Sequence, residues 1–387
     1  MNLKELDTTY VAGTYKRFPV DIVAGKGSLV RDGEGREYID LGTGIAVNSF
    51  GVADEAWQQA VIAQVGKVQH TCNLYYSEPC AKLAEMLCAR TGMKKVFFSN
   101  SGAEANECAV KVARKYAAEH LGPEYSTIVT LKNSFHGRTL TTLAATGQDA
   151  FHKLFAPLTP GFVSVAVGDT EELERVFAGE KVAGILIECV QGEGGVCPLP
   201  QDYAQAVERI AHEHGALLMV DEVQTGNGRT GTLYAYMGFG LHPDVVSTAK
   251  GLAGGLPLGA TMMSEKVQDV LGPGDHGSTF GGNPVCCAAA LSVLGRIDDA
   301  LLADVREKSA WLFNTLRAMP GVVSVTGKGL MIGVKTEKPA SEVISACIDG
   351  GVLCLSAKDK VRFLPALNIP MELLEKAMAV FREAVRP

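Results

Sequence analysis

The sequence contains one lysine whose position suits nucleophilic chemistry. Lys250 follows the apolar run at residues 244–249 (DVVSTA) and precedes Gly251. An ammonium group at the end of a buried strand is costly to desolvate, and burial favours the neutral amine. A neutral lysine amine can attack an aldehyde and form a Schiff base. A solvated lysine at a strand end has the same local sequence, so the neighbouring motifs must decide between these interpretations.

An aspartate precedes this lysine by 29 residues (250 − 221 = 29). Asp221 ends the hydrophobic run at residues 216–220 (ALLMV). A buried carboxylate needs a cationic partner. A protonated pyridine nitrogen is one such partner, and the pair would keep the ring an electron sink. An arginine or lysine of the protein would satisfy the same carboxylate, which is the alternative interpretation.

The motif SNSGAEANE has the features of an anion site. Ser101 and Glu104 form a capping box, which predicts that a helix starts here. The small residues Gly102 and Ala103 leave the first N–H groups of that helix open, and a helix N-terminus at a strand end suits a phosphate. The hydroxyls of GSTFGGNP, at residues 277–284, could complete such a site. An ordinary capped helix is the alternative.

Two further motifs carry groups that recognise planar rings and carboxylates. In SFHGRT, Phe135 can stack on a ring and Arg138 offers a planar fork for a carboxylate. The glycine-rich loop 188–195 (ECVQGEGG) supplies Glu188 and Glu193. A solvated arginine and a solvated turn are the alternatives. A phosphate cradle, a stacking aromatic, a ring-nitrogen carboxylate and a Schiff-base lysine at the strand ends of one sheet match pyridoxal phosphate.

Short apolar runs alternate with amphipathic segments in the part of the chain that carries these motifs. Strands are predicted at residues 96–99, 127–131, 162–167, 183–190, 216–223, 244–249 and 259–264. Helices are predicted at about residues 55–67, 78–91, 102–120, 171–178 and 202–213. Continuous hydrophobicity in the strands indicates that helices cover both faces, so the sheet should be mainly parallel. These elements predict one large α/β domain over residues 50–285.

The two ends of the chain have a different pattern. A hairpin is predicted over residues 28–41 around DGEG, and residues 42–50 follow as an irregular loop. After a helical region at 285–318, strands are predicted at 322–327, 330–335, 352–356 and 361–367, followed by a helix at 370–385. Residues 1–49 with 286–387 would thus form a smaller α+β domain.

Composition limits the classes of partner. The 387 residues carry a formal net charge of −7, which argues against nucleic acid or an anionic membrane as the main partner. The longest apolar run, residues 285–294, is shorter than the ~18 residues of a membrane span. The first ten residues resemble neither a secretion signal nor a transit peptide. Ten cysteines without a CxxC motif then indicate reduced thiols, a cytoplasmic protein and no zinc site.

Several longer motifs resemble those of a known family. They are GTGIAVNSFG, HTCNLYY, KVFFSNSGAEANE, SFHGRT, QGEGG, DEVQTGNGRTG, STAKGLAGGLPLGA, GSTFGGNP and RFLPAL, and they span essentially the whole chain. The sequence is similar to the class III aminotransferases of the pyridoxal-phosphate fold-type I group. Within that group it most resembles the acetylornithine, succinylornithine and ornithine aminotransferases. The resemblance implies the fold-type I architecture, in which a large α/β domain carries the cofactor and a smaller domain comes from the two termini.

The resemblance assigns roles around the cofactor ring. Lys250 would form the Schiff base and then move a proton between the substrate carbon and the cofactor's C4′. Asp221 would pair with the pyridine nitrogen. Val223 would pack on the ring face opposite Phe135, and Gln224 would form a hydrogen bond near the ring hydroxyl.

The resemblance also places the phosphate between two subunits of a homodimer, so that the active sites are shared. Gly102 and Ala103 would hold it through their backbone N–H groups, and Thr279 would reach it from the other subunit. Ser278 of that same subunit would contact the substrate.

Substrate binding is assigned to charged groups. Arg138 would bind the α-carboxylate of N-acetylornithine and the distal carboxylate of glutamate or 2-oxoglutarate. Arg362 would bind the α-carboxylate of glutamate, and Glu193 would neutralise Arg362 when the ω-amino donor is bound. Gly44 and Ile45 stand where ornithine-specific relatives carry a tyrosine, which leaves room for an acyl group. The implied reaction moves the ω-amino group of N-acetylornithine to 2-oxoglutarate in arginine biosynthesis.

Other activities remain open at this stage. Succinylornithine, ornithine and 4-aminobutyrate are alternative donors, since one extra contact discriminates by only about 1–3 kcal/mol. A pyridoxal-phosphate decarboxylase or aminomutase, or an inert binding relative, would share the fold. The sequence departs from the family at residues 52–56 (VADEA), where a histidine-proline pair is usual, and at Cys189, where proline is usual. Neither position supplies a reacting group.

Overall fold

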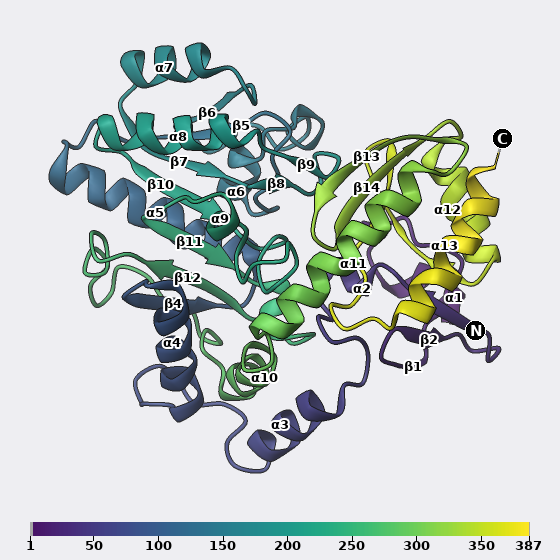
Figure 1. Cartoon of the computed structure of the whole chain (residues 1–387). Coiled ribbons are helices and arrows are strands. Elements are labelled where there is room, and N and C mark those ends of the chain that lie inside the picture. The colour runs from purple at the N-terminus through teal and green to yellow at the C-terminus, as the bar shows by residue number, and fades with distance from the viewer. Residues whose placement is uncertain (1–2, 387) are drawn as a thin grey trace.

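A seven-stranded sheet forms the larger lobe of the computed structural model, which describes residues 3–386 (Figure 1). Its strands, in spatial order, are β4 (Lys95–Ser99), β12 (Gly259–Met263), β11 (Val245–Thr248), β10 (Leu217–Asp221), β7 (Val182–Ile187), β5 (Thr127–Leu131) and β6 (Phe162–Val165). Strand β12 runs antiparallel to both neighbours, and all other pairs are parallel. The predicted α/β fold with a mainly parallel sheet is confirmed.

The two faces of this sheet bury different side chains. Within β10, Leu218 and Val220 belong to one buried cluster, whereas Leu217 and Met219 belong to another, as the two-residue period of a strand requires. The first cluster includes side chains of α8 (Gln201–Glu213), and the second includes those of α5 (Gly102–His120). Helices therefore cover both faces, which explains the continuous hydrophobicity of the strands.

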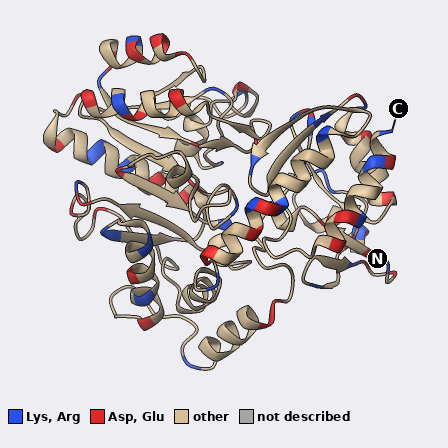
Figure 2. Ribbon diagram, viewed as in Figure 1, with Lys and Arg blue, Asp and Glu red and all other residues tan. Residues whose placement is uncertain are grey.

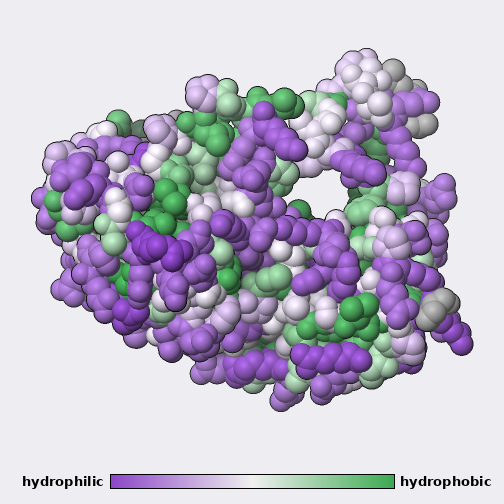
Figure 3. Space-filling model, turned by 90° about the horizontal axis from the view of Figure 1, so that it is seen from above, coloured by the Kyte–Doolittle hydropathy of each residue, from purple (hydrophilic) through white to green (hydrophobic). Residues whose placement is uncertain are grey.

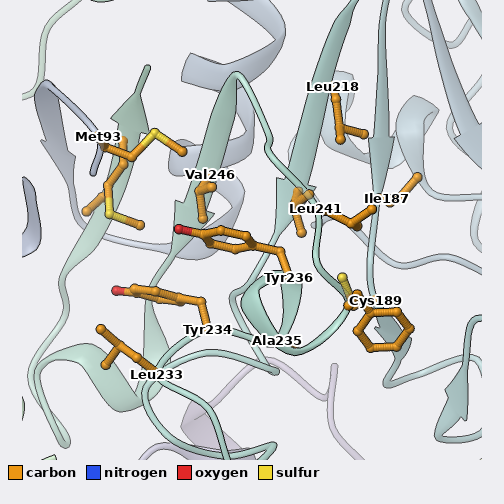
Figure 4. Packing of buried hydrophobic residues seen from close by; sticks show 14 of the residues in the cluster. Met93, Ile187, Cys189, Leu218, Leu233, Tyr234, Ala235, Tyr236, Leu241 and Val246 are labelled. Carbon is orange, nitrogen blue, oxygen red and sulfur yellow. The ribbon is translucent and has the colours of Figure 1, made fainter. Parts of the chain in front are cut away.

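The first of these clusters also contains a pair of stacked tyrosines. The rings of Tyr234 and Tyr236 lie 6.2 Å apart between centroids and are nearly parallel, at 12°. Figure 4 shows them beside Val246 of β11. Tyr234 precedes α9 (Ala235–Gly238) and Tyr236 lies within it, so this short helix is fixed against the sheet.

The remaining elements of the larger lobe are helices at its edges and short connecting pieces. They are α3 (Glu55–Val65), α4 (Glu78–Thr91), α6 (Leu140–Ala145), the 3₁₀ turn Asp149–Phe151, α7 (Thr170–Gly179), β8 (Val190–Gln191), β9 (Cys197–Pro198) and the 3₁₀ turn Lys250–Leu252. The helical region predicted at 285–318 consists of two helices, α10 (Pro284–Leu294) and α11 (Asp299–Arg317). Helix α11 begins separately because Asp298 caps it, accepting a hydrogen bond from the backbone N–H of Leu301 at 2.8 Å.

A smaller lobe contains two four-stranded sheets. The first has the order β1 (Ala24–Lys26), β2 (Leu29–Arg31), β3 (Glu37–Asp40) and β15 (Val352–Leu353). The second has the order β13 (Val322–Lys328), β14 (Met331–Thr336), β17 (Lys360–Phe363) and β16 (Leu355–Ala357). Its helices are α1 (Leu3–Tyr10), α2 (Thr43–Ala46), α12 (Ala340–Asp349) and α13 (Met371–Val385). The predicted strand at 352–356 is divided between the two sheets, and α12 was not predicted.

Both chain ends lie in the smaller lobe, and α11 runs between the lobes (Figure 1). A separate buried cluster fills the smaller lobe, from Val30 to Val385. Buried side chains of α10 belong instead to the cluster of the larger lobe. We propose a domain division like the one predicted from sequence, 50–285 against both termini, with the boundary moved to the end of α10.

The segment Thr43–Ala46 forms a left-handed turn that joins the two chain ends. All four residues have positive φ, from 46° at Thr43 to 66° at Gly44 and Ile45. Thr43 Oγ1 donates to the carbonyl of Leu364 at 2.6 Å, and Asp40 accepts from the backbone N–H of Thr43 at 2.8 Å. Three non-glycine residues in this conformation store strain that the surrounding contacts must offset.

The surface is mixed in charge and hydropathy. Lys and Arg are interspersed with Asp and Glu along the outer helices (Figure 2). One face of the molecule is mainly hydrophilic with separate hydrophobic patches (Figure 3). No helix in residues 3–386 is long and apolar enough to span a membrane. All ten cysteines are free thiols.

Candidate active site

A cavity of about 480 Å³ opens at the carboxyl ends of the central strands. The predicted site residues that line it are Gly102, Ala103, Phe135, Arg138, Asp221, Val223, Gln224 and Lys250. Glu188 and His136 line it as well. Residues separated by up to 148 positions (250 − 102 = 148) thus meet at one end of the sheet, which is where open parallel sheets bind ligands.

Lys250 has the surroundings of a nucleophile. It begins the 3₁₀ turn after β11 and has a left-handed backbone, with φ of 46°. Within residues 3–386 its ammonium has no hydrogen-bond or ion-pair partner. Burial lowers the pKa of Lys250, and the nearby charges of Glu193 and Asp221 oppose that shift in part. A lower pKa makes the neutral, nucleophilic amine easier to form.

Asp221 is fixed by three donors and is 4% exposed. Its Oδ2 accepts from Asn106 Nδ2 at 2.7 Å and lies 2.8 Å from His136 Nδ1. Its Oδ1 accepts from the backbone N–H of Val223 at 2.9 Å. Asn106 is held in turn by the hydroxyl of Ser247, which donates to Asn106 Oδ1 at 2.5 Å. These contacts orient the carboxylate toward the cavity and prevent its rotation.

Sequence reasoning gave no role to Asn106 and His136. One sequence feature could have indicated a role for Asn106. It is a polar residue on the side of α5 that also carries the buried residues Ala105 and Cys108. The only partner of the His136 ring among the described residues is Asp221, and its Nε2 is buried without a partner. Both side chains position the aspartate.

The start of α5 forms an open anion cradle. Ser101 Oγ accepts from the N–H of Glu104 at 3.2 Å, as the capping box predicted. The N–H groups of Gly102 and Ala103 have no partner in the described part of the chain and border the cavity. A Cβ atom on Gly102 would lie 2.6 Å from Cγ1 of Val223, so only glycine permits this approach. The free amine, the cradle and the carboxylate together fit an aromatic aldehyde that bears a phosphate.

Arg362 and Glu193 form an ion pair beside the cavity and do not line it. Arg362 Nη1 lies 2.5 Å from Glu193 Oε1 and also donates to Gln224 Oε1 at 3.0 Å. Burial alone would raise the pKa of Glu193, but the charge and hydrogen bond of Arg362 outweigh it and lower that pKa. The carboxylate is therefore ionised and neutralises the guanidinium. The Nε of Arg362 is buried without a partner.

Arg138 is a second cation and is exposed at the cavity. Its guanidinium lies 4.9 Å from the ring centroid of Phe151 and 5.8 Å from that of Phe135. It has no carboxylate partner within residues 3–386. This planar donor is available to an anionic ligand.

Glu188 connects two loops of the site. It is 5% exposed and accepts from the N–H of Phe135 at 2.9 Å and from that of Gly192 at 3.2 Å. Burial raises the pKa of Glu188 to about 7, against the charge of His136, which lowers it. Glu188 thereby ties the backbone of Phe135 to the loop that carries Glu193.

Besides Glu193 and Arg362, four predicted residues do not line this cavity in their own chain. Thr279 is exposed, and Ser278 Oγ accepts from Asn100 Nδ2 at 3.0 Å, where Asn100 does line the cavity. Gly44 and Ile45 lie in the left-handed turn, and Gly44 borders a separate cavity of about 450 Å³. The described residues contain no cluster of three or more His, Cys, Asp or Glu placed to hold a metal ion.

Comparisons of the sequence and of the structure with known proteins agree on one family. Residues 10–385 match the family described as Aminotransferase class-III. The acetylornithine aminotransferase of Haemophilus ducreyi is 49% identical over 385 residues, which cover 99% of this chain and 98% of that protein. The N-acetylornithine aminotransferase of Stenotrophomonas maltophilia K279a has a solved structure with a TM-score of 0.85 and 34% identity, covering 99% of this chain and 98% of its own.

An ornithine aminotransferase is also similar in structure. One structure of the Toxoplasma gondii enzyme has a TM-score of 0.93 and 31% identity, and covers 99% of this chain and 93% of its own. That structure is described with partial occupancy of PLP, pyridoxal phosphate, at the active site. The fold, the cavity and these relatives lead to one conclusion. The chain belongs to the class III aminotransferases and is a pyridoxal-phosphate-dependent aminotransferase.

Proposed function

We propose that this chain transfers the ω-amino group of N-acetylornithine to 2-oxoglutarate, yielding N-acetylglutamate 5-semialdehyde and glutamate. The observation that carries the proposal is the combination of one free lysine amine with two separate arginines. Lys250 and Arg138 line the cavity. Arg362 lies beside it and is paired with Glu193, whose side chain is partly exposed. Two anchors suit an enzyme that must accept both a mono-carboxylate amine donor and a dicarboxylate. The names of the relatives support the choice of N-acetylornithine.

The residues around the cavity fit pyridoxal phosphate. Bound there, it would supply an electron sink for negative charge at the carbon that bears the amine. The N–H groups of Gly102 and Ala103 would hold the phosphate, and Asp221 would pair with the pyridine nitrogen. Phe135 and Val223 would enclose the ring.

Lys250 would attach the cofactor's aldehyde and then serve as the acid and base of the reaction. Its Nζ would take the proton from the substrate carbon that bears the amine and return it to the cofactor's C4′. Burial lowers the pKa of Lys250, which makes its neutral amine easier to form and so favours its use as a base.

The two arginines would bind different carboxylates of the substrates. Arg138 would bind the α-carboxylate of N-acetylornithine and the distal carboxylate of glutamate or 2-oxoglutarate. Arg362 would bind the α-carboxylate of glutamate, after Glu193 has moved away. The small residues Gly44 and Ile45 would leave room for the acyl group.

We infer a homodimer with shared sites. Thr279 is exposed in its own chain, as is the adjacent Phe280, at 59%. Leu74 and Tyr76 are exposed as well, and such apolar surface usually marks an interface. In the dimer, Thr279 and Ser278 would reach the cavity of the other subunit. Ten free thiols support a cytoplasmic location.

The proposal is tested by kcat/KM with 2-oxoglutarate as acceptor. N-acetylornithine, succinylornithine, ornithine and 4-aminobutyrate are compared as donors, and we expect N-acetylornithine to give the highest value. A higher value for another donor would identify that donor as the preferred substrate, and the proposed transfer of an amino group to 2-oxoglutarate would still stand. Turnover of an amino acid without stoichiometric consumption of 2-oxoglutarate would instead indicate a decarboxylase or aminomutase.

The Glu193→Gln variant should lose its preference for N-acetylornithine over glutamate. Without the carboxylate, Arg362 keeps an uncompensated charge whenever an ω-amino donor is bound. We expect the ratio of kcat/KM values, N-acetylornithine over glutamate, to fall by about tenfold or more. Stopped-flow measurement of the two half-reactions gives this ratio directly. An unchanged ratio would contradict the neutralising role of Glu193.

A further inference from the structure

The side-chain amide of Gln224 lies between the cavity and the Glu193–Arg362 pair. Gln224 lines the cavity, whereas Glu193 and Arg362 do not. Its Oε1 accepts from Arg362 Nη1 at 3.0 Å, and its Nε2 donates to Glu193 Oε1 at 3.4 Å. One neutral side chain therefore contacts both members of the ion pair.

The three side chains differ in their freedom to move. Glu193 is 30% exposed at its side chain and is surrounded by the glycines of its loop. Gln224 is 7% exposed, and a Cβ atom on Gly192 would lie only 2.5 Å from its Nε2, so the amide is packed against backbone. Arg362 is 3% exposed and sits in β17, which is paired on both sides with β14 and β16. Glu193 therefore has solvent beside it into which its side chain can turn, whereas Gln224 and Arg362 are enclosed by the surrounding chain.

The unequal exposure of these side chains determines which hydrogen-bond partners Arg362 keeps when Glu193 turns away. A buried guanidinium without any acceptor is strongly unfavourable. Gln224 Oε1 still accepts from Nη1 in that state, because the amide stays in place. An uncharged acceptor does not neutralise the arginine, and the unpaired Nε retains a free donor for an incoming carboxylate.

We propose that Gln224 is a specificity-determining residue, the fixed neutral acceptor that holds Arg362 in position while Glu193 is away. It thereby leaves the charge of Arg362 for the α-carboxylate of glutamate. This role adds to any contact between Gln224 and the cofactor ring. The inference rests on the proposed function, because it requires an enzyme that uses both glutamate and an ω-amino donor.

The test is the Gln224→Glu variant, studied as holoenzyme in single-turnover half-reactions with glutamate and with N-acetylornithine. A carboxylate at this buried position cannot swing away, so it would neutralise Arg362 permanently. We expect the efficiency ratio, glutamate over N-acetylornithine, to fall about 10- to 100-fold relative to wild type. General damage to the cofactor site affects both half-reactions and cancels in the ratio.

A matched control moves the carboxylate without changing the net charge. The double variant Glu193→Gln/Gln224→Glu keeps one carboxylate beside Arg362 but places it on the side chain that cannot move. We expect its ratio to stay as low as that of Gln224→Glu, whereas Glu193→Gln alone raises the ratio. The Gln224→Met variant, which removes the acceptor without adding charge, should lower the ratio through a higher KM for glutamate.

Two results would overturn the inference. One is a Gln224→Glu variant whose two half-reactions slow equally, since that pattern indicates a role at the cofactor alone. The other is a double variant with the wild-type ratio, which would show that the mobility of the carboxylate is irrelevant. Failure of the proposed function is recognised separately, because the wild-type holoenzyme would then not react with N-acetylornithine.

Discussion

Replacement of Lys250 by alanine should reduce turnover by on the order of 10⁴-fold, the upper range for loss of a positioned acid–base group. The variant would lose both the amine that attaches the cofactor and the base that moves the proton. Nothing else in the described residues replaces it, because no second lysine lines the cavity. The measurement is kcat with N-acetylornithine and 2-oxoglutarate at saturating pyridoxal phosphate, together with the visible absorbance of the purified protein before and after borohydride treatment.

The control is Lys250→Arg, which keeps a cation at this position but has no reactive amine. We expect the same loss of turnover from it. Since Lys250 makes no hydrogen bond in the described structure, its removal should not lower the melting temperature of the cofactor-free protein. An alanine variant with turnover within tenfold of wild type would refute the assignment.

The second largest effect is expected for Asp221→Asn. The amide has nearly the same volume but no charge, so a protonated pyridine nitrogen would lose its partner. Removing such a preorganised electrostatic contact costs about 10²- to 10³-fold in kcat. Affinity for pyridoxal phosphate should fall as well, which titration of the cofactor-free protein with absorbance detection would measure.

Asn106→Ala is the matched control for this variant. It removes one of the donors to Asp221 Oδ2 but keeps the charge, and His136 Nδ1 remains 2.8 Å from the same oxygen. Its loss of kcat should therefore be clearly smaller than that of Asp221→Asn. Equal losses in the two variants would mean that the orientation of the carboxylate matters more than its charge.

The sequence predicted those parts of the site that depend on local patterns. Lys250 and Gly102 each follow a strand that is recognisable as an apolar run, and Asp221 ends one. The capping box located the start of α5. The division of the chain into strands and helices followed for the same reason. Continuous hydrophobicity in the strands also predicted that helices cover both faces of a mainly parallel sheet. The two buried clusters confirm the covered faces, and the strand pairing confirms the direction.

Other parts were not predictable because they depend on contacts between distant residues. Asn106 meets Asp221 across 115 positions, and His136 meets it across 85. Gln224 was expected near the cofactor ring on resemblance alone, whereas the structure also places its amide against Arg362, 138 residues away. Helix α12 was missed because its sequence, ASEVISACID, has several residues of low helix propensity, and tertiary packing overrides that preference.

The hydrogen bonds between the two chain ends have a consequence for biosynthesis. Strand β3 pairs with β15, and the carbonyls of Leu41 and Ser49 accept from the N–H groups of Leu364 and Leu367. Leu364 and Leu367 are synthesised long after the segment that they complete. The nascent chain can thus assemble the large sheet early, as domains generally do during translation. The segment around Leu41 and Ser49, by contrast, gains these backbone partners only once residues 352–367 have been synthesised.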